Sequence, residues 1–300
     1  MYPCSNPELV AAASESGALG VIQPLSLTYV YGYSFKDGLQ RIQSLTSKPV
    51  GMNLLIEGSS RKYRKTMEYW MNEALESGIK FFISSMGKPD WVTKLAHSAD
   101  AVVYHDVTEQ HWANVALDQG VDGLIAVNNR AGGHAGTLSS EQLILDLKQY
   151  GVPIVCAGGV ATSEDYRQAL KSGYDAVQMG TRFIATNECA AGNEYKQAIV
   201  ASDSSQVVMT ERITGVPVSV INNAMVQKEG LYPNFIEKLL LKHRKFKHLA
   251  RMLLAFKSLR TLKQSLHVEK SSRDYWQAGK SVDGVDSVKS VNSIIQEFTT

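Results

Sequence analysis

The sequence contains few cysteines and no long run of apolar residues. Its three cysteines, Cys4, Cys156 and Cys189, lie far apart and lack metal-ligand spacing, so neither a disulfide framework nor a metal site is predicted. No run of about 18 apolar residues is present, which argues against a transmembrane span. The first residues show no positive and then apolar region typical of a signal peptide. We therefore expect a reduced, cytoplasmic protein.

A strong charge of one sign is also absent. The chain has 31 Lys and Arg against 29 Asp and Glu, a net charge of +2 at pH 7. This balance provides no overall attraction for nucleic acid, which is excluded as a partner. With 300 residues, 44% of them hydrophobic, the chain has the length of one α/β barrel or of two smaller domains.

Short apolar runs alternate with amphipathic stretches from residue 1 to about residue 186. Mostly apolar strands that alternate with helices indicate a parallel sheet covered by helices. The pattern predicts seven strands, centred near residues 20, 52, 82, 102, 125, 155 and 177.

A (β/α)₈ TIM barrel needs one strand more, and the chain opens instead on a helix that begins at Asn6 and Pro7. Seven strands would leave two unpaired edges. We therefore predict an α/β fold, a TIM barrel whose first strand is missing from this chain, with a small C-terminal helical subdomain. The predicted parts are a barrel core at 1–200, a helical insert over the barrel at 201–274, and a helix that closes the barrel at 275–300.

One stretch departs from the charge balance. Residues 232–264 carry nine Lys and Arg against the single acid Glu237, and apolar residues recur there at helical spacing. We interpret this basic stretch, which continues to residue 270, as part of a helical subdomain packed on the barrel with a solvated basic face. An acidic protein partner and a membrane surface are the alternatives.

A glycine-rich loop follows the fifth predicted strand. Gly132, Gly133 and Gly136 surround His134, and glycines let the backbone come close to a flat or charged ligand. A histidine at the carboxyl end of a barrel strand is well placed for proton transfer near neutral pH. The alternative is a turn with an incidental surface histidine.

Glycines also follow the last two predicted strands, in the sequences Ala157-Gly158-Gly159-Val160 and Met179-Gly180-Thr181-Arg182. The corresponding loops of such barrels commonly bind phosphate through backbone N–H groups and the start of a short helix, predicted here at 181–186. Together they predict a phosphate site; ordinary strand-to-helix turns are the alternative.

Three sequences, AGGHAG (131–136), AGGV (157–160) and AVQMGTRFIATNEC (176–189), resemble the nitronate monooxygenase family, formerly called 2-nitropropane dioxygenases. The related flavin-type enoyl-acyl carrier protein reductases share these elements. The resemblance runs from 6–20 to 275–285 and implies a (β/α)₈ flavoprotein barrel that binds FMN non-covalently.

The resemblance also implies roles for individual residues. His134 would be the catalytic histidine, Asn53 would bond the isoalloxazine, and Gly132 and Gly133 would let the loop approach the cofactor. Met1 is similar to the methionine that ends the first strand in the family. The phosphate end of FMN would be held by Gly158, Gly159, Gln178, Met179, Gly180 and Thr181.

The chain departs from the family pattern just before the AGGH loop. Many members have glutamine, glycine and glutamate in this stretch, where this chain reads Val127-Asn128-Asn129-Arg130. The flavin hydrogen bond of the glutamine could then pass to Asn128 or Asn129. Arg130 would favour an anionic substrate: a nitronate, a carboxylate or a phosphopantetheine arm.

The resemblance predicts an FMN-dependent oxidoreductase that oxidises alkyl nitronates with O₂ to a carbonyl compound and nitrite. His134 would bond the nitronate oxygens or act as the base on a neutral nitroalkane. An NAD(P)H-dependent enoyl-acyl carrier protein reductase is the first alternative, in which the basic stretch would receive an acidic acyl carrier protein. A non-catalytic or unstable truncated remnant is the second. A homodimer is consistent with each.

Overall fold

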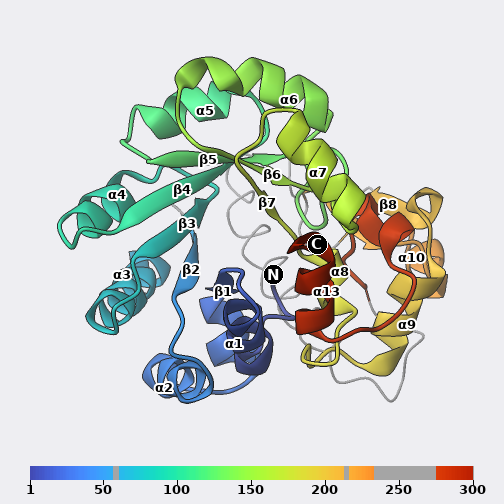
Figure 1. Ribbon diagram of the computed structural model, residues 1–300, viewed down its shortest axis with the longest axis horizontal. Helices are drawn as coiled ribbons and strands as arrows, with labels where there is room; N and C mark the ends of the chain where they lie inside the picture. Colours follow the sequence, from blue (N-terminus) through green and yellow to red (C-terminus); the bar gives the residue numbers. More distant parts are fainter. Residues whose placement is uncertain (57–60, 213–215, 233–274, 300) are drawn as a thin grey trace.

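The computed structural model describes residues 1–56, 61–212, 216–232 and 275–299. Its main feature is one parallel sheet of seven strands whose spatial order follows the chain. The sheet curls into the wall of a barrel, with β1 and β7 at its two ends (Figure 1). The predicted strand count and the α/β barrel class are confirmed. The strands are β1 (Gly20–Ile22), β2 (Val50–Leu55), β3 (Phe81–Ser85), β4 (Val102–Val107), β5 (Gly123–Val127), β6 (Ile154–Ala157) and β7 (Ala176–Gln178).

Helices that connect consecutive strands cover the outside of the sheet (Figure 1). The start of the last is fixed by its sequence: Thr162 Oγ1 accepts from the amide of Asp165 at 3.1 Å, and the Asp165 carboxylate accepts from the amide of Thr162 at 2.9 Å. This reciprocal cap satisfies two N–H groups that the helix itself cannot. The connecting helices are α2 (Phe35–Leu45), α3 (Arg61–Glu76), α4 (Asp90–His97), α5 (Gln110–Leu117), α6 (Ser140–Leu147) and α7 (Ser163–Lys171), and α1 (Pro7–Glu15) precedes β1.

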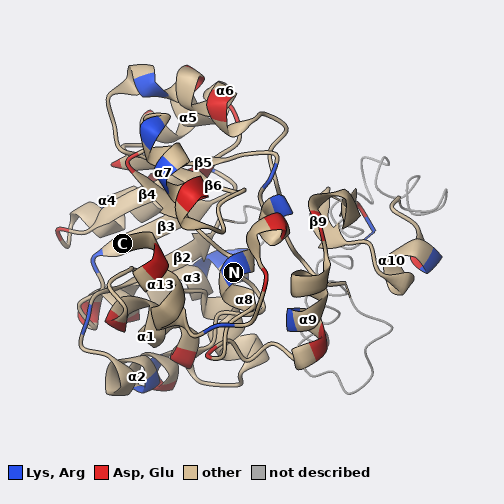
Figure 2. Ribbon diagram, turned by 45° about the vertical axis from the view of Figure 1, so that its right-hand side comes forward, with Lys and Arg blue, Asp and Glu red and all other residues tan. Residues whose placement is uncertain are grey.

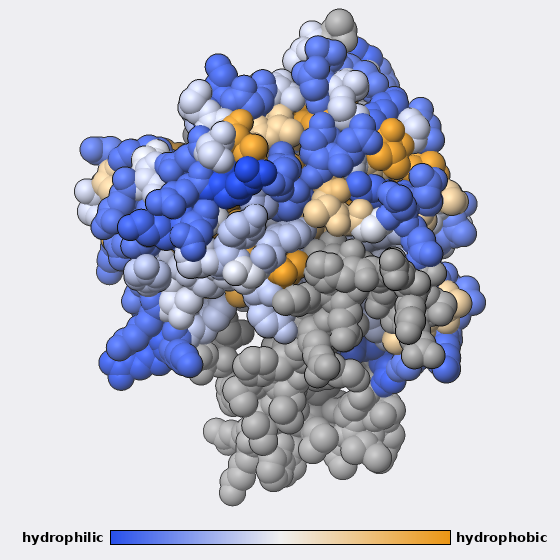
Figure 3. Space-filling model, turned by 90° about the horizontal axis from the view of Figure 1, so that it is seen from below, coloured by the Kyte–Doolittle hydropathy of each residue, from blue (hydrophilic) through white to orange (hydrophobic). Residues whose placement is uncertain are grey.

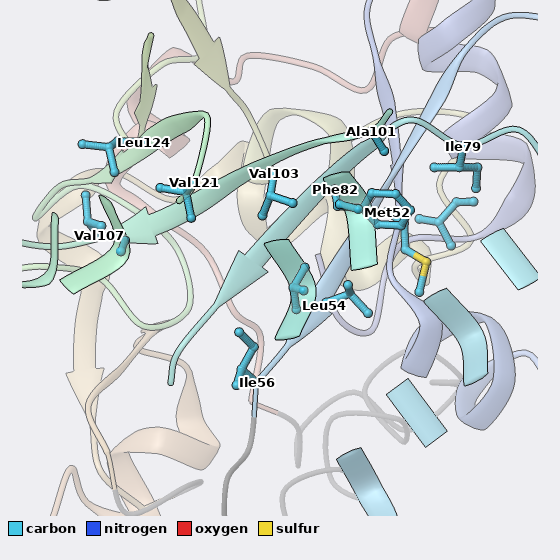
Figure 4. Close-up of a cluster of buried hydrophobic side chains, with 14 of the residues drawn as sticks. Met52, Leu54, Ile56, Ile79, Phe82, Ala101, Val103, Val107, Val121 and Leu124 are labelled. Carbon is cyan, nitrogen blue, oxygen red and sulfur yellow. The ribbon is translucent and has the colours of Figure 1, made fainter. Parts of the chain in front are cut away.

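Alternation along each strand divides the side chains between two apolar clusters. Met52, Leu54 and Phe82 point outward and are buried under the helices (Figure 4). Ile83 and Ile125 belong to a separate cluster inside the barrel. Because side chains alternate with a period of two, the same inward face carries polar groups nearer the carboxyl ends of β2, β3 and β4. The barrel thus has an apolar interior beneath a polar rim.

The two ends of the sheet are covered by the C-terminal part of the chain. The helix α13 (Val291–Thr299) packs against both α1 and α7. Ile294 of α13 and Leu9 of α1 share an apolar cluster with residues of α8 (Thr181–Ile184) and α9 (Asn193–Ala201). This cluster holds the C-terminal segment against the barrel wall.

The part predicted as a helical insert also contains two strands. The sequence indicates an extended segment at 206–210 and a loop or strand at 216–222, and the structure pairs β8 (Val207–Thr210) antiparallel with β9 (Val218–Ile221), followed by the short helix α10 (Ala224–Glu229). Adjacent β-branched residues favour strands here. The segment after β1 forms a π-helical turn, η1 (Ser26–Val30), that buries two apolar side chains. Of the helix expected at 232–264, residues 233–264 lie outside the described residues.

The surface carries both charge signs. Basic and acidic residues are interspersed over the helices (Figure 2), and the face in Figure 3 is mainly hydrophilic with small, separate hydrophobic groups. Within the described ranges, no helix is both long and apolar enough to cross a membrane, and no group of three metal-ligating side chains is present. The remaining short helices are η2 (Lys148–Tyr150), η3 (Ser204–Gln206) and η5 (Lys280–Gly284).

Candidate active site

The loops after β5, β6 and β7 meet at the carboxyl end of the sheet. A Cβ on Gly158 would lie 2.5 Å from the amide nitrogen of Ala131, and one on Gly132 would lie 3.0 Å from that of Gly279. The Thr181 hydroxyl accepts a hydrogen bond from the same Gly279 amide at 2.9 Å. The predicted glycines and Thr181 are therefore brought together, and the C-terminal segment around Gly279 joins them.

The backbone at this junction offers free donors. In the described part of the chain, the amides of Gly159, Gly180 and Thr181 donate no hydrogen bond. Gly158 and Gly159 adopt φ values of +115° and +82°, which L side chains rarely take. Thr181 opens the short helix α8. Unbonded N–H groups beside glycines and a helix start suit a phosphate dianion. The residues present thus fit the phosphate end of FMN.

His134 lies on the glycine-rich loop, which β9 anchors: the amide of Ser219 donates to the carbonyl of Gly133 at 2.8 Å. The imidazole is exposed to solvent and makes no hydrogen bond to any described residue. Protein atoms around the ring nevertheless desolvate it in part, which lowers its pKa. The ring is therefore neutral at pH 7 and can accept a proton.

The side chains of Asn53 and Gln178 point to the inside of the barrel, as the alternation along their strands requires. Asn53 is half-buried, and its side-chain amide donates to the hydroxyl of Ser85 at 3.4 Å. Gln178 stands in register with Ala157, which belongs to the inner cluster. Met179 packs against both clusters that lie outside the barrel, so only its backbone is available to a ligand at the mouth.

Asn128 and Arg130 have other partners than the sequence suggested. Asn128 is fully buried; its side chain donates to the carbonyl of Gly158 at 2.9 Å and accepts from the amide of Arg130 at 2.8 Å. Its amide is thus used to hold two loops together and is not available to a flavin. Arg130 turns to the C-terminal segment, where its guanidinium donates to Asp283 at 3.0 Å and to the carbonyl of Lys280 at 3.1 Å. An anion at this loop would have to compete with Asp283.

Asp106, on β4, was missed by the sequence reasoning. Asp106 lies two residues after Tyr104 on the same strand, so their side chains point to the same face of the sheet. Tyr104 packs against the inner cluster, which places Asp106 on the inward face. One carboxylate oxygen is buried without a hydrogen-bond partner among the described residues. Burial raises the pKa of this carboxyl to about 7. The sequence offered one signal for this residue: Asp106 is a single acid at an inward-facing position of a predicted strand.

The whole chain, residues 1–300, matches the family model described as nitronate monooxygenase. The chain belongs to the nitronate monooxygenase family. A probable nitronate monooxygenase of Staphylococcus saprophyticus is 26% identical over 290 residues, covering 79% of this chain and 78% of the relative. A (3aS,4S,5R,7aS)-5-hydroxy-7a-methyl-1-oxo-octahydro-1H-indene-4-carboxyl-CoA dehydrogenase of Rhodococcus jostii is 26% identical over 223 residues, covering 74% of this chain but only 61% of that relative.

Solved structures share the fold. FabK from Thermotoga maritima superposes with a TM-score of 0.79 at 23% identity, covering 100% of this chain and 89% of that one. A nitroalkane oxidase from Streptomyces ansochromogenes superposes with a TM-score of 0.74 at 19% identity, covering 99% and 92%. The predicted family and barrel are confirmed.

Proposed function

We propose that this family member is an FMN-dependent oxidoreductase that converts alkyl nitronates and O₂ to a carbonyl compound and nitrite. The observation that supports it most is the group of unbonded amides at Gly159, Gly180 and Thr181, which lies beside the loop that carries His134. FMN, when bound, accepts electrons from the substrate and passes them to O₂.

Different residues of the chain would bind the phosphate end and the isoalloxazine end of FMN. The three amides hold the phosphate, with Gly158 shaping the loop. Asn53 supplies an amide for the isoalloxazine at the inward rim of β2. Gly132 and Gly133 leave space for the ring system because neither has a side chain.

His134 would bind the substrate at the opening of the barrel. A neutral imidazole can donate one hydrogen bond to a nitronate oxygen, or accept the C–H proton of a neutral nitroalkane. Asp106 affects the charge at the same end of the barrel: with a pKa of about 7, it is largely uncharged in mildly acidic solution. Repulsion of an anionic substrate is then weak.

A second candidate function is the oxidation or reduction of a thioester, including the NAD(P)H-dependent enoyl-acyl carrier protein reduction that the resemblance leaves open. Two observations favour it. One relative is named as a carboxyl-CoA dehydrogenase, and a cation-rimmed cavity lies next to the mouth of the barrel, lined in part by Arg64 and Lys88.

The binding half of the proposal is tested by titrating FMN into the apoprotein and following flavin fluorescence. A Cβ at Gly180 would meet only the flexible Met1 thioether, at 3.3 Å, so Gly180→Val should fold yet bind FMN far more weakly than wild type. Thr181→Ala should weaken binding less, because the amide donor remains. Equal affinity of wild type and Gly180→Val would remove the phosphate site. No FMN binding at all would favour the non-catalytic interpretation.

The catalytic half is tested by measuring nitrite release and O₂ uptake with preformed nitronates, with and without FMN. We expect both signals only in the flavin-loaded protein. FMN-loaded protein that consumes NADH with an enoyl thioester, but releases no nitrite from a nitronate, would favour the second candidate.

A further inference from the structure

A cavity of about 200 Å³ opens beside the carboxyl end of β2, between the first turns of α3 and α4. Its lining combines an apolar wall with two cations, and Asp90 is the one acid among its described lining residues. Such a surface suits a ligand with an apolar or planar body and negative charge. The apolar wall and the cations are formed by Leu55, Ile56, Met67, Trp91, Arg64 and Lys88.

The helix α3 brings more positive charge to this place. Four of the five residues from 61 to 65 are Lys or Arg. Arg64 is already engaged: it pairs with Glu68 at 2.8 Å and lies 5.8 Å from the Trp91 ring centroid. Arg61, Lys62 and Lys65 are exposed and form no ion pair with any described residue.

A second hollow lies on the opposite, outer face of α3, and its lining shares no described residue with the first. It has a volume of about 600 Å³, and its described lining consists of Arg61, Lys62, Lys65, Thr66 and Tyr69. The Tyr69 side chain is 55% exposed, so a planar group could stack on its ring. Three cations beside an exposed aromatic ring match the chemistry of a purine nucleotide that carries several phosphates.

The position of these hollows relates them to the active site. Leu55 and Ile56 follow Asn53 on the same chain segment, two and three residues later, which is about 7–10 Å at the rise of a strand. The loop after β3 brings Lys88 to the rim; it turns through Met86 and Gly87, both at positive φ. A ligand held here by its charged end can extend an arm into the barrel mouth.

We propose that these two hollows bind the phosphoadenosine end of a coenzyme A thioester, whose pantetheine arm extends toward the flavin. The proposal rests on the second candidate function. An alkyl nitronate is too small to need a charged site of this extent, whereas a coenzyme A thioester combines a purine, three phosphate groups and a long neutral arm.

The test is isothermal titration of flavin-loaded protein with coenzyme A, dephospho-coenzyme A and pantetheine. The test variant is Arg61→Gln/Lys62→Gln/Lys65→Gln. The control is Lys94→Gln/Lys148→Gln/Lys171→Gln, which removes three exposed charges near the C-terminal ends of their helices, toward the other end of the barrel. We expect wild type to bind coenzyme A most tightly and pantetheine most weakly, with affinity for coenzyme A falling as salt rises.

The test variant should bind coenzyme A about tenfold more weakly, equivalent to about 1.4 kcal/mol, while the control stays within about twofold of wild type by the same measure. Failure of wild type to bind coenzyme A, or equal affinity of wild type and test variant, would overturn the proposal. Charge-dependent binding of purified acyl carrier protein without binding of coenzyme A would also overturn it.

Two parallel measurements separate this proposal from the flavin proposal. FMN affinity is determined for every variant, which shows whether any loss arises at the flavin site. The coenzyme A titration is repeated on protein without flavin. If FMN fails to bind but coenzyme A binds with the expected dependence on α3, the flavin proposal fails and the thioester site stands.

Discussion

The hydroxyl of Thr181 accepts a hydrogen bond from the amide of Gly279, 98 residues further along the chain, at 2.9 Å. The neighbouring amide of Lys280 donates to the carbonyl of Arg130, also at 2.9 Å. Two separate loops of the barrel are thus joined to one C-terminal segment. The phosphate end of the candidate site depends on a part of the sequence that lies outside its glycine motifs.

Replacing Thr181 with valine should destabilise the protein by about 1–3 kcal/mol, because the buried Gly279 amide would lose its acceptor. Thr181→Ser keeps the hydroxyl and is the control. Urea unfolding followed by circular dichroism measures the difference. If both variants unfold at the same urea concentration as wild type, the hydrogen bond does not hold the segment in place.

Gly158→Ala should cost much more stability than Gly151→Ala. Both glycines have positive φ, +115° and +66°, so both replacements strain the backbone. At Gly151 an added Cβ meets nothing within 4 Å, whereas at Gly158 it would lie 2.4 Å from Asn128 Oδ1. We expect Gly151→Ala to cost about 1 kcal/mol, and Gly158→Ala to exceed it by at least 1–3 kcal/mol through overpacking. Equal melting temperatures would contradict the close packing of these loops.

The sequence predicted the barrel because its strands are apolar and regularly spaced, and it identified the loops because glycine motifs are local signals. The roles of Asn128 and Arg130 could not be found in this way. Both depend on partners from other loops, Gly158 and Asp283, whose approach is decided by tertiary packing. The pairing of β8 with β9 could not be predicted for a related reason: short strands gain their stability mainly from pairing, which local sequence shows poorly.

Asp106 should make stability depend on pH. Burial raises the pKa of its carboxyl from 3.8 to about 7, only partly offset by the nearby amino group of Met1. The folded state therefore binds a proton more tightly than the unfolded state. The cost of burying the charged form is absent below pH 3.8, grows between pH 3.8 and about 7, and is complete above that range.

Asp106→Asn should remove this cost. At pH 8 the variant should be more stable than wild type, by a margin on the order of a few kcal/mol at most, and at pH 4 the two should be nearly equal. Urea unfolding across this pH range measures the effect. A constant stability difference between the two proteins at all pH values would show that Asp106 does not titrate as described.

His134 should matter for chemistry far more than for folding, because its ring makes no hydrogen bond to any described residue. His134→Asn keeps a hydrogen-bond donor but cannot accept a proton near neutral pH. With neutral nitroalkanes, where a C–H proton must be removed, we expect a rate loss of about 10²–10⁴-fold. With preformed nitronates the loss should be smaller, about 1–2 kcal/mol. FMN content and melting temperature should stay near wild type; equal loss with both substrate forms would contradict a role as base.

The most direct test of the central claim is the rate of flavin reduction in the wild-type, FMN-loaded protein under anaerobic conditions. Stopped-flow absorbance follows the flavin after mixing with a preformed alkyl nitronate and, separately, with NADH. We predict rapid reduction by the nitronate and slow or no reduction by NADH. Rapid reduction by NADH together with none by a panel of nitronates would contradict the proposed nitronate oxidation.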